Sequence, residues 1–268
     1  MRIAQGISIT NTSKPVGITY DADATAFFTA ASITDTTQKS AINTLVISLK
    51  AANIWTKMKA LYPVVGGVAS SHAINLKQPG TYNLTFATGW THSSTGMTPN
   101  GATYANTGLT PSTSLNLNTS HISFYSRTNN TANYSDFGAA GVGASNTNYL
   151  QILSKWSDSN FYGLANDVDF TANTVTTSTG LFIVSRTGVS ASKNYKDGSI
   201  ITTKTGSSVS LSDRSLVLSA RNLASGGLSN YSNRQCAFAS IGDGLTDAES
   251  LSFYNAVQAY QTTLDRQV

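Results

Sequence analysis

Acidic side chains are the groups that could perform acid–base chemistry in this chain of 268 residues, and glutamate is almost absent from them. Of the 13 acidic residues only Glu249 is a glutamate. β-Sandwich glucanases normally use two glutamates close together on one strand, one as general acid and one as nucleophile. Glu249 also completes a capping-box pattern with Thr246, which gives it a structural role. We therefore expect a protein that is not an enzyme, with a glycan-degrading or esterase-type hydrolase as the alternative.

Asp167 and Asp169 are a close pair of aspartates that would share a face if Val168 between them lies in a strand. Carboxylate oxygens at such a spacing are typical calcium ligands. A turn or solvated loop explains the same residues without any ligand. We favour the solvated loop, keep calcium as the one cofactor that stays open, and expect no other.

Other catalytic patterns are missing from the sequence. His72, His92 and His121 stand far apart, and with one cysteine no zinc-ligand spacing arises. No Gly-x-Ser-x-Gly nucleophile elbow occurs. The glycine-rich run 138–143 lacks the Gly-Lys-Ser/Thr ending of a phosphate loop, so we interpret it as a mobile loop. Cys236 lies in an apolar run, which predicts a buried thiol.

Aromatic residues beside polar turns give the best binding candidates. Trp156 and Tyr162 stand near Asp158 and Asn160, and Trp90 stands beside polar residues of its own segment. Aromatic faces with neighbouring carboxylate and amide groups suit sugar recognition, because one group stacks on the ring and the others bond its hydroxyls. The competing interpretation is that these aromatics form the edge of the core.

The elements that would position these residues are mainly β. Charged residues make up 11% of the chain and hydrophobic residues 40%, so Ser, Thr, Asn and Gly must cover much of the surface. These are turn and strand formers. The net charge is +4, with basic residues scattered singly, so we expect no nucleic-acid partner.

Helical patterns occupy the two ends of the chain. Apolar spacing after Asp35 predicts a helix over 35–51, and a short second helix is expected at 54–61 before Pro63. The first thirty or so residues have no period and are expected to form an extended arm. A capping box at Thr246 predicts a C-terminal helix over about 246–264.

Between these ends the hydrophobic residues recur at a period close to two. Short strand-like runs separated by turns over about 68–241 indicate an antiparallel sandwich or barrel. Asp197-Gly198 predicts a tight hairpin with a type I′ turn. We divide the chain into an N-terminal arm and helical segment, 1–67, and a sandwich with its C-terminal helix, 68–268.

Two segments resemble known families. Residues 43–67, in which Trp55, Lys57-Met58, Tyr62-Pro63 and Gly66-Gly67 follow in order, resemble an N-terminal helical signature of bacteriophage structural proteins. The part from 181 to the end resembles the closing half of concanavalin A-like or laminin G-like jelly rolls, where a last strand leads into a Leu-Thr-x-x-Glu helix. The resemblance implies two stacked antiparallel sheets and glycan or protein binding, without defined ligand residues.

These resemblances lead to a hypothesis about cellular setting. They imply a virion component, such as a head fibre, a capsid decoration or a tail-associated module, with other virion proteins, copies of itself and host-surface glycan as partners. The N-terminus has no apolar signal region, and no run approaches a membrane span. We therefore expect synthesis in the host cytoplasm and location on the virion. Whether the chain is a scaffold or binds a receptor stays open.

Overall fold

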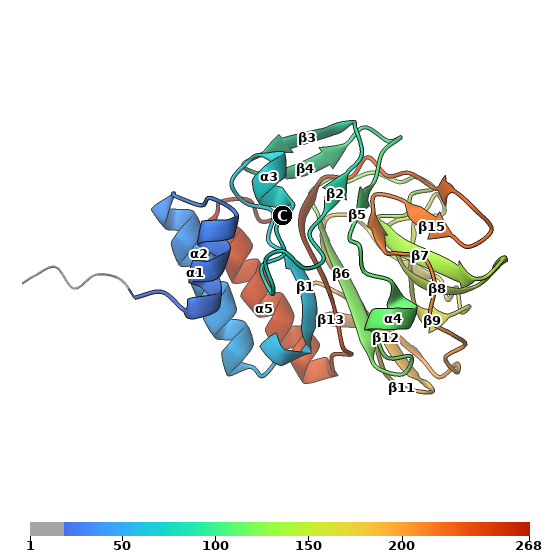
Figure 1. Ribbon diagram of the computed structural model, residues 1–268. Coiled ribbons are helices and arrows are strands. Elements are labelled where there is room, and N and C mark those ends of the chain that lie inside the picture. The colour runs from blue at the N-terminus through green and yellow to red at the C-terminus, as the bar shows by residue number, and fades with distance from the viewer. Residues whose placement is uncertain (1–18) are drawn as a thin grey trace, which may run out of the picture.

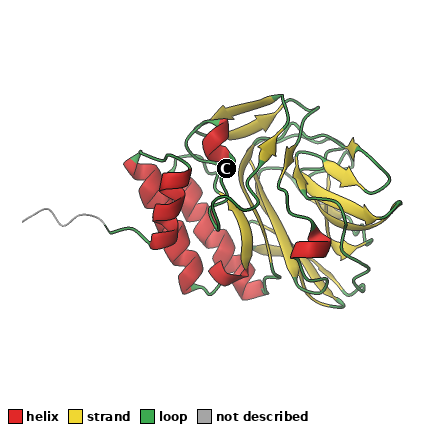
Figure 2. Ribbon diagram, viewed as in Figure 1, coloured by secondary structure: helices red, strands yellow, loops and turns green. Residues whose placement is uncertain are grey.

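A computed structural model describes residues 19–268, and the part of the predicted arm over 1–18 lies outside these described residues. Three layers stand side by side: a layer of helices, then one β-sheet, then a second (Figures 1 and 2). The predicted mostly-β sandwich with an N-terminal helical segment and a C-terminal helix is confirmed.

The middle layer is an eight-stranded sheet with the order β13-β12-β11-β6-β17-β4-β3, and β1 also pairs with β17. All of its pairs are antiparallel. Its strands are β1 (Met58–Tyr62), β3 (Trp90–Ser93), β4 (Gly96–Pro99), β6 (Ser120–Ser126), β11 (Gly180–Gly188), β12 (Ala191–Lys196), β13 (Ser199–Lys204) and β17 (Cys236–Gly242).

The outer layer is a nine-stranded sheet with the order β10-β9-β8-β7-β14-β5-β2, extended by β15 and β16. One pair, β15 with β7, is parallel, and the others are antiparallel. Its strands are β2 (Thr85–Phe86), β5 (Ala105–Asn106), β7 (Phe137–Val142), β8 (Ser145–Leu153), β9 (Asn160–Asp167), β10 (Asn173–Thr174), β14 (Val217–Leu218), β15 (Arg221–Leu223) and β16 (Leu228–Ser229).

The middle sheet is buried on both faces because its side chains alternate between two cores. Phe124 and Phe182 point into the core between the sheets, whereas their neighbours Tyr125 and Ile183 belong to the core beneath the helices. This is the alternation that the pleat of a strand imposes. All seven residues of β6 are buried as a result.

The helices are α1 (Ala22–Ala30), α2 (Thr36–Ala51), α5 (Asp247–Thr263) and two one-turn helices, α3 (Ala69–His72) and α4 (Pro111–Ser114). The two long predicted helices are confirmed. Asp35 caps α2 by accepting a hydrogen bond from the Gln38 backbone N–H, and Thr246 and Glu249 form the predicted capping box of α5.

Three local predictions were wrong. The predicted helix at 54–61 is a 3₁₀ turn, Trp55–Lys57, followed by strand β1, because pairing with β17 buries four of the five β1 side chains. The expected extended arm contains α1 within its described part, since Phe27 and Phe28 bury against the helical layer. The glycine-rich run 138–143 belongs mostly to β7, where Gly138 lets the backbone approach Gln151.

Two further predictions hold. Asp197 and Gly198 both have positive φ, 49° and 78°, and join β12 to β13 in the predicted hairpin. Cys236 is 1% exposed, and burial raises the pKa of its thiol. Among the described residues no helix is long and apolar enough to cross a membrane.

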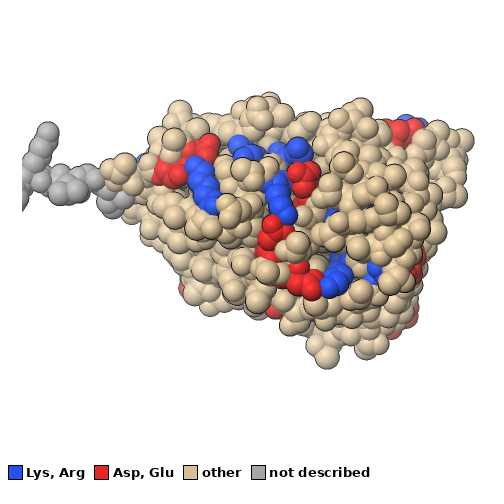
Figure 3. Space-filling model, turned by 90° about the horizontal axis from the view of Figure 1, so that it is seen from below, with Lys and Arg blue, Asp and Glu red and all other residues tan. Residues whose placement is uncertain are grey.

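The surface carries few charged residues, as the composition indicates. On the face drawn in Figure 3 uncharged residues predominate, and basic and acidic atoms lie beside one another in small groups. Ion pairs of the described chain include Lys50 with Asp21 and Asp23, and Lys57 with Glu249. That face presents no broad patch of one sign.

An aromatic cleft on the outer sheet

A cleft of about 400 Å³ lies on the outer side of the nine-stranded sheet. Strands β7, β8, β9 and β15, which surround it, stand at the end of the molecule away from the helices (Figure 1). Its lining combines aromatic, charged and amide side chains from separate segments, namely Leu153, Trp156, Asp158, Tyr162, Phe170, Arg221 and Asn230. We call this site the aromatic cleft.

The floor of the cleft follows from strand alternation. Leu153 of β8 is paired with Tyr162 of β9, and both lie on the outward face. Their neighbours Ile152 and Phe161 point the opposite way, into the core between the sheets. A sheet that buries one face thus presents Tyr162 to solvent on the other.

Trp156 and Asp158 come from the turn between β8 and β9. Ser159 adopts a positive φ of 67°, which closes the turn, and its N–H donates to the Trp156 carbonyl at 2.9 Å. The Tyr162 hydroxyl donates to Asp158 Oδ2 at 2.6 Å, and the Asn160 backbone N–H donates to Oδ1 at 3.0 Å. Although partial burial opposes it, these hydrogen bonds lower the pKa of Asp158. Asp158 is therefore an ionised acceptor at neutral pH.

Phe170 forms one wall, on the segment that follows β9. It is 42% exposed, and its ring meets Tyr149 edge-on with centroids 5.0 Å apart and lies 6.2 Å from the Tyr162 centroid. Beneath this segment the buried Lys204 ammonium donates to the carbonyls of Gly163 and Asp169. The apolar wall is therefore supported by hydrogen bonds to backbone rather than by packing alone.

Arg221 and Asn230 form the opposite wall, at the β15–β16 hairpin. The Arg221 guanidinium lies over the Tyr149 ring, 5.7 Å from its centroid, and Nη2 donates to Asn230 Oδ1 at 2.9 Å. Cation–π contact and the amide acceptor fix the direction of the side chain. Burial lowers the pKa of Arg221 without approaching neutrality, because an arginine remains charged in proteins.

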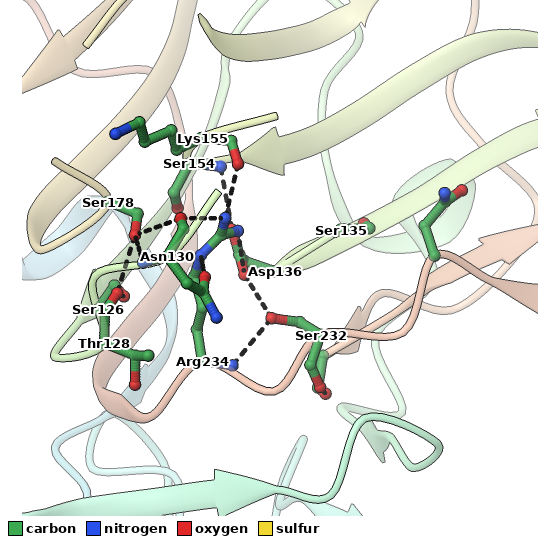
Figure 4. A network of polar contacts seen from close by, with 12 residues as sticks. Ser126, Thr128, Asn130, Ser135, Asp136, Ser154, Lys155, Ser178, Ser232 and Arg234 are labelled. Carbon is green, nitrogen blue, oxygen red and sulfur yellow. Dashed lines mark hydrogen bonds and ion pairs between the residues drawn. The ribbon is translucent and has the colours of Figure 1, made fainter. Parts of the chain in front are cut away.

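A buried network beside the cleft holds its backbone in place (Figure 4). Arg234 donates to both oxygens of Asp136, at 3.1 and 2.9 Å, and to the Lys155 carbonyl at 2.6 Å. Asp136 also accepts from the Ser154 backbone N–H at 2.9 Å. Since Ser154 and Lys155 precede Trp156, this ion pair fixes the strand end from which the tryptophan projects.

The predicted binding residues are brought together only in part. Trp156, Asp158 and Tyr162 line the cleft. Asn160 is adjacent, but its side-chain oxygen accepts from Thr174 at 3.1 Å and is not in the lining. Trp90 lies on β3 in the other sheet, packs against Phe86 and donates to the Tyr104 carbonyl, as a residue at the edge of the core does.

The sequence patterns did not predict four of the lining residues as site residues: Leu153, Phe170, Arg221 and Asn230. Phe170 follows the aspartate pair closely enough to have been noticed as an exposed aromatic. Arg221 and Asn230 carry no local signal, because the pairing of β15 with β7 brings them to the cleft.

The calcium candidates do not converge. Asp167 is 2% exposed, and its carboxylate pairs with Arg186 Nη2 at 2.8 Å and faces Lys204 Nζ at 3.8 Å. Asp169 Oδ1 accepts instead from the Thr171 hydroxyl. Within residues 19–268 no group of three or more His, Cys, Asp or Glu side chains could hold a metal ion.

One histidine pair was missed because its members are distant in sequence. His72 Nδ1 and His92 Nδ1 lie 2.9 Å apart. His72 is fully buried, which lowers its pKa to about 3, so its ring is neutral at physiological pH. Two neutral rings that share one hydrogen bond form a structural contact between α3 and β3.

Comparisons with known proteins reveal the fold alone. No family model matches the sequence, and curated proteins give no match either. Among solved structures, a mutant sialidase of Trypanosoma rangeli displaying trans-sialidase activity aligns at 8% identity and a TM-score of 0.54, covering 81% of this chain and 39% of that chain. This chain thus spans well under half of the sialidase.

Two other similar structures have lower scores. Domain 4 of an extracellular arabinanase from Geobacillus stearothermophilus, in complex with arabinotriose, aligns at 14% identity and a TM-score of 0.45, covering 74% of this chain and 98% of that chain. The binding domain of botulinum neurotoxin serotype D aligns at 12% identity and 0.40, covering 76% and 52%.

The sandwich fold predicted by resemblance is therefore confirmed, and the bacteriophage resemblance stays a prediction. The expectation that the chain is not an enzyme was wrong. It rested on the missing glutamate pair, whereas the fold matched here is part of a sialidase chain. Because this sandwich occurs within a glycosidase, the shortage of glutamates does not exclude catalysis.

Proposed function

We propose that the chain binds carbohydrate, with one or two sugar units seated in the aromatic cleft. The observation that carries the proposal is the convergence of Trp156, Tyr162 and Phe170, from a turn, a strand and a following segment, with a carboxylate, an amide and a guanidinium. Each group has a separate task in sugar binding.

The aromatic rings supply the apolar contact. The C–H face of a pyranose packs on an aromatic ring as an apolar surface does, and half-exposed rings lose little conformational freedom when they are covered. Phe170 is held against Tyr149, and Tyr162 is held by its hydrogen bond to Asp158. The cleft is thus formed before a ligand arrives, which reduces the cost of ordering it.

The polar groups orient the bound sugar. Asp158 Oδ2 and Oδ1 accept hydrogen bonds, and the Asn230 amide and Arg221 guanidinium supply an acceptor and donors on the other wall. Sugar hydroxyls both donate and accept, so a site with acceptors on one side and donors on the other selects an orientation. The volume of about 400 Å³ lies within the usual range of small-ligand sites.

Isothermal titration and a glycan array on the purified full chain would test this proposal. Trp156→Ala should weaken binding at least tenfold, because the stacking surface is lost. Tyr104→Ala is the matched control, since this half-buried aromatic lies outside the cleft. Unchanged affinity in Trp156→Ala, with the wild type binding, would reject the cleft as the site. The same incubations should be analysed for released sugars, because product formation would extend binding to turnover.

We further propose that this binding operates on a bacteriophage virion, with host-surface glycan as ligand and virion proteins and copies of the chain as partners. The support is the resemblance of residues 43–67 to phage structural proteins and the charge-poor composition. Cryo-electron microscopy of particles that contain the protein would test it. A position inside a capsid shell would contradict attachment, and a distal position with the aromatic cleft exposed would support it.

A further inference from the structure

Arg221 is the one described arginine that lines the aromatic cleft. Arg186, Arg214 and Arg234 each pair with an aspartate. Within residues 19–268 no carboxylate lies within salt-bridge distance of Arg221. Arg127 and Arg266 also lack a carboxylate partner among these residues, but they lie outside the cleft and donate to backbone carbonyls and glutamine side chains. A half-buried cation without a counter-ion stands in the lining of the cleft.

The hydrogen bonds of Arg221 leave part of its donor set free. Nη2 donates to Asn230 Oδ1 at 2.9 Å, and Nε approaches the Ser229 hydroxyl at 3.4 Å. Nη1 has no hydrogen-bond partner among the described residues, and it is not among their solvent-inaccessible unpaired atoms. A guanidinium has five N–H donors, so both donors of Nη1 remain for a ligand.

The surroundings of Arg221 favour an anion that approaches from the cleft. Tyr149 covers one face of the guanidinium, and Asn230 and Ser229 hold its edge, so the side chain is fixed before binding. Asp158, the carboxylate of the same cleft, instead accepts from Tyr162 and makes no ion pair with Arg221. Asp158 therefore supplies hydrogen-bond acceptors in one part of the cleft, and Arg221 supplies a positive charge and free N–H donors in another.

We propose that the sugar bound in the aromatic cleft is an acidic one, a sialic or uronic acid whose carboxylate binds Nη1 of Arg221. This inference rests on the proposed function. A carboxylate matches the planar donor geometry of a guanidinium, and partial exclusion of water strengthens the charge-assisted bond. The ring and remaining hydroxyls of the same sugar then face Trp156, Tyr162 and Asp158.

The test compares matched acidic and neutral probes by isothermal titration on the full chain. The pairs are 3′-sialyllactose with lactose, and trigalacturonic acid with its methyl ester, and lactose 3′-sulfate separates a carboxylate from another anion. The wild type should bind at least one acidic probe about tenfold or more tightly than its neutral partner, with the advantage decreasing as salt rises.

The variant Arg221→Gln should lose this acidic advantage, so that its affinities for the acidic probe and for the neutral partner become equal within about threefold. Arg221→Lys should recover it in part, because charge is kept and the planar geometry is lost. Lys39→Gln is the charge-matched control, since it removes one positive charge from α2, which contributes no residue to the cleft. Thermal unfolding of each variant verifies that the fold is intact.

The outcomes separate the two proposals. Equal binding of acidic and neutral probes, or an acidic advantage that survives Arg221→Gln, would overturn the acidic-sugar inference and leave carbohydrate binding standing. Tighter binding of the sulfate than of either carboxylate would overturn the choice of carboxylate. Absence of binding to every probe and to a broad glycan array would overturn both proposals.

Discussion

Arg234, in the buried network beside the aromatic cleft, and Arg221, in the cleft itself, differ in how completely their hydrogen-bond donors are used. Arg234 is 1% exposed, and its five N–H groups meet Asp136, the Asn130 side chain and two backbone carbonyls. Arg221 meets an amide and a hydroxyl and keeps Nη1 free among the described residues. A saturated guanidinium holds the protein together, whereas an unsaturated one in a cleft can hold a ligand.

The largest effect is expected at the saturated network. Arg234→Leu leaves the Asp136 carboxylate buried without its cation, so the free energy of unfolding should fall by about 3–5 kcal/mol. Chemical denaturation measures it. The double variant with Asp136→Leu should recover much of the loss, because no isolated charge remains. A loss below about 1 kcal/mol in the single variant would show that Arg234 is not the structural arginine of this pair.

The second largest effect is a pH dependence of the folding stability, which arises from a buried histidine. His121 is fully buried between the Asp243 carbonyl, at 2.6 Å, and the Ser240 hydroxyl, at 3.0 Å, and burial lowers its pKa from 6.5 to about 4. The unfolded chain therefore takes up the proton first. The contribution of the neutral His121 ring to the free energy of unfolding is complete above about pH 6.5. It declines as the pH falls and levels off below about pH 4.

This difference in pKa corresponds to about 3 kcal/mol across that window. As the pH falls from 7 to 4, the denaturant concentration at the unfolding midpoint should decrease less steeply for His121→Gln than for the wild type. Both proteins keep the pH dependence that His72 causes. Parallel pH profiles of the two proteins would contradict the assignment to His121. Glycan affinity should not follow this titration, because no histidine lines the cleft.

The smallest effect is expected on stability at the unsaturated arginine. Arg221→Gln removes no ion pair, and Asn230 Oδ1 keeps its hydrogen bond from the Ser229 hydroxyl. The free energy of unfolding should therefore change by less than about 1 kcal/mol. A loss comparable to that of Arg234→Leu would make Arg221 a structural residue and remove the contrast between the two regions.

Sequence patterns predicted the elements that depend on local chemistry. The caps at Asp35 and Thr246 and the Asp197-Gly198 turn each act within a few residues, and all three appear in the structure. Strand β1 was misassigned because a run of five residues with four apolar side chains fits either a helix or a strand. Its partner β17, about 180 residues later, decides the outcome.

The same limit applies to the cleft. Trp156, Asp158 and Tyr162 lie in one turn and its following strand, so their neighbourhood could be seen in the sequence. Arg221 reaches them through a parallel pairing of β15 with β7 that no local pattern encodes. Whether the donors of an arginine are saturated depends on partners from several segments and needs coordinates.

The indole N–H signals of the three tryptophans would report directly whether a sugar binds in the aromatic cleft. Trp156 lines the cleft, whereas Trp55 is buried among the helices and Trp90 packs in the other sheet. In a two-dimensional ¹H–¹⁵N titration with 3′-sialyllactose, with signals assigned by Trp-to-Phe variants, the Trp156 signal is expected to shift and saturate while the other two stay unchanged. A static Trp156 signal at saturating ligand, or a shift confined to Trp55 or Trp90, would contradict sugar binding in the cleft.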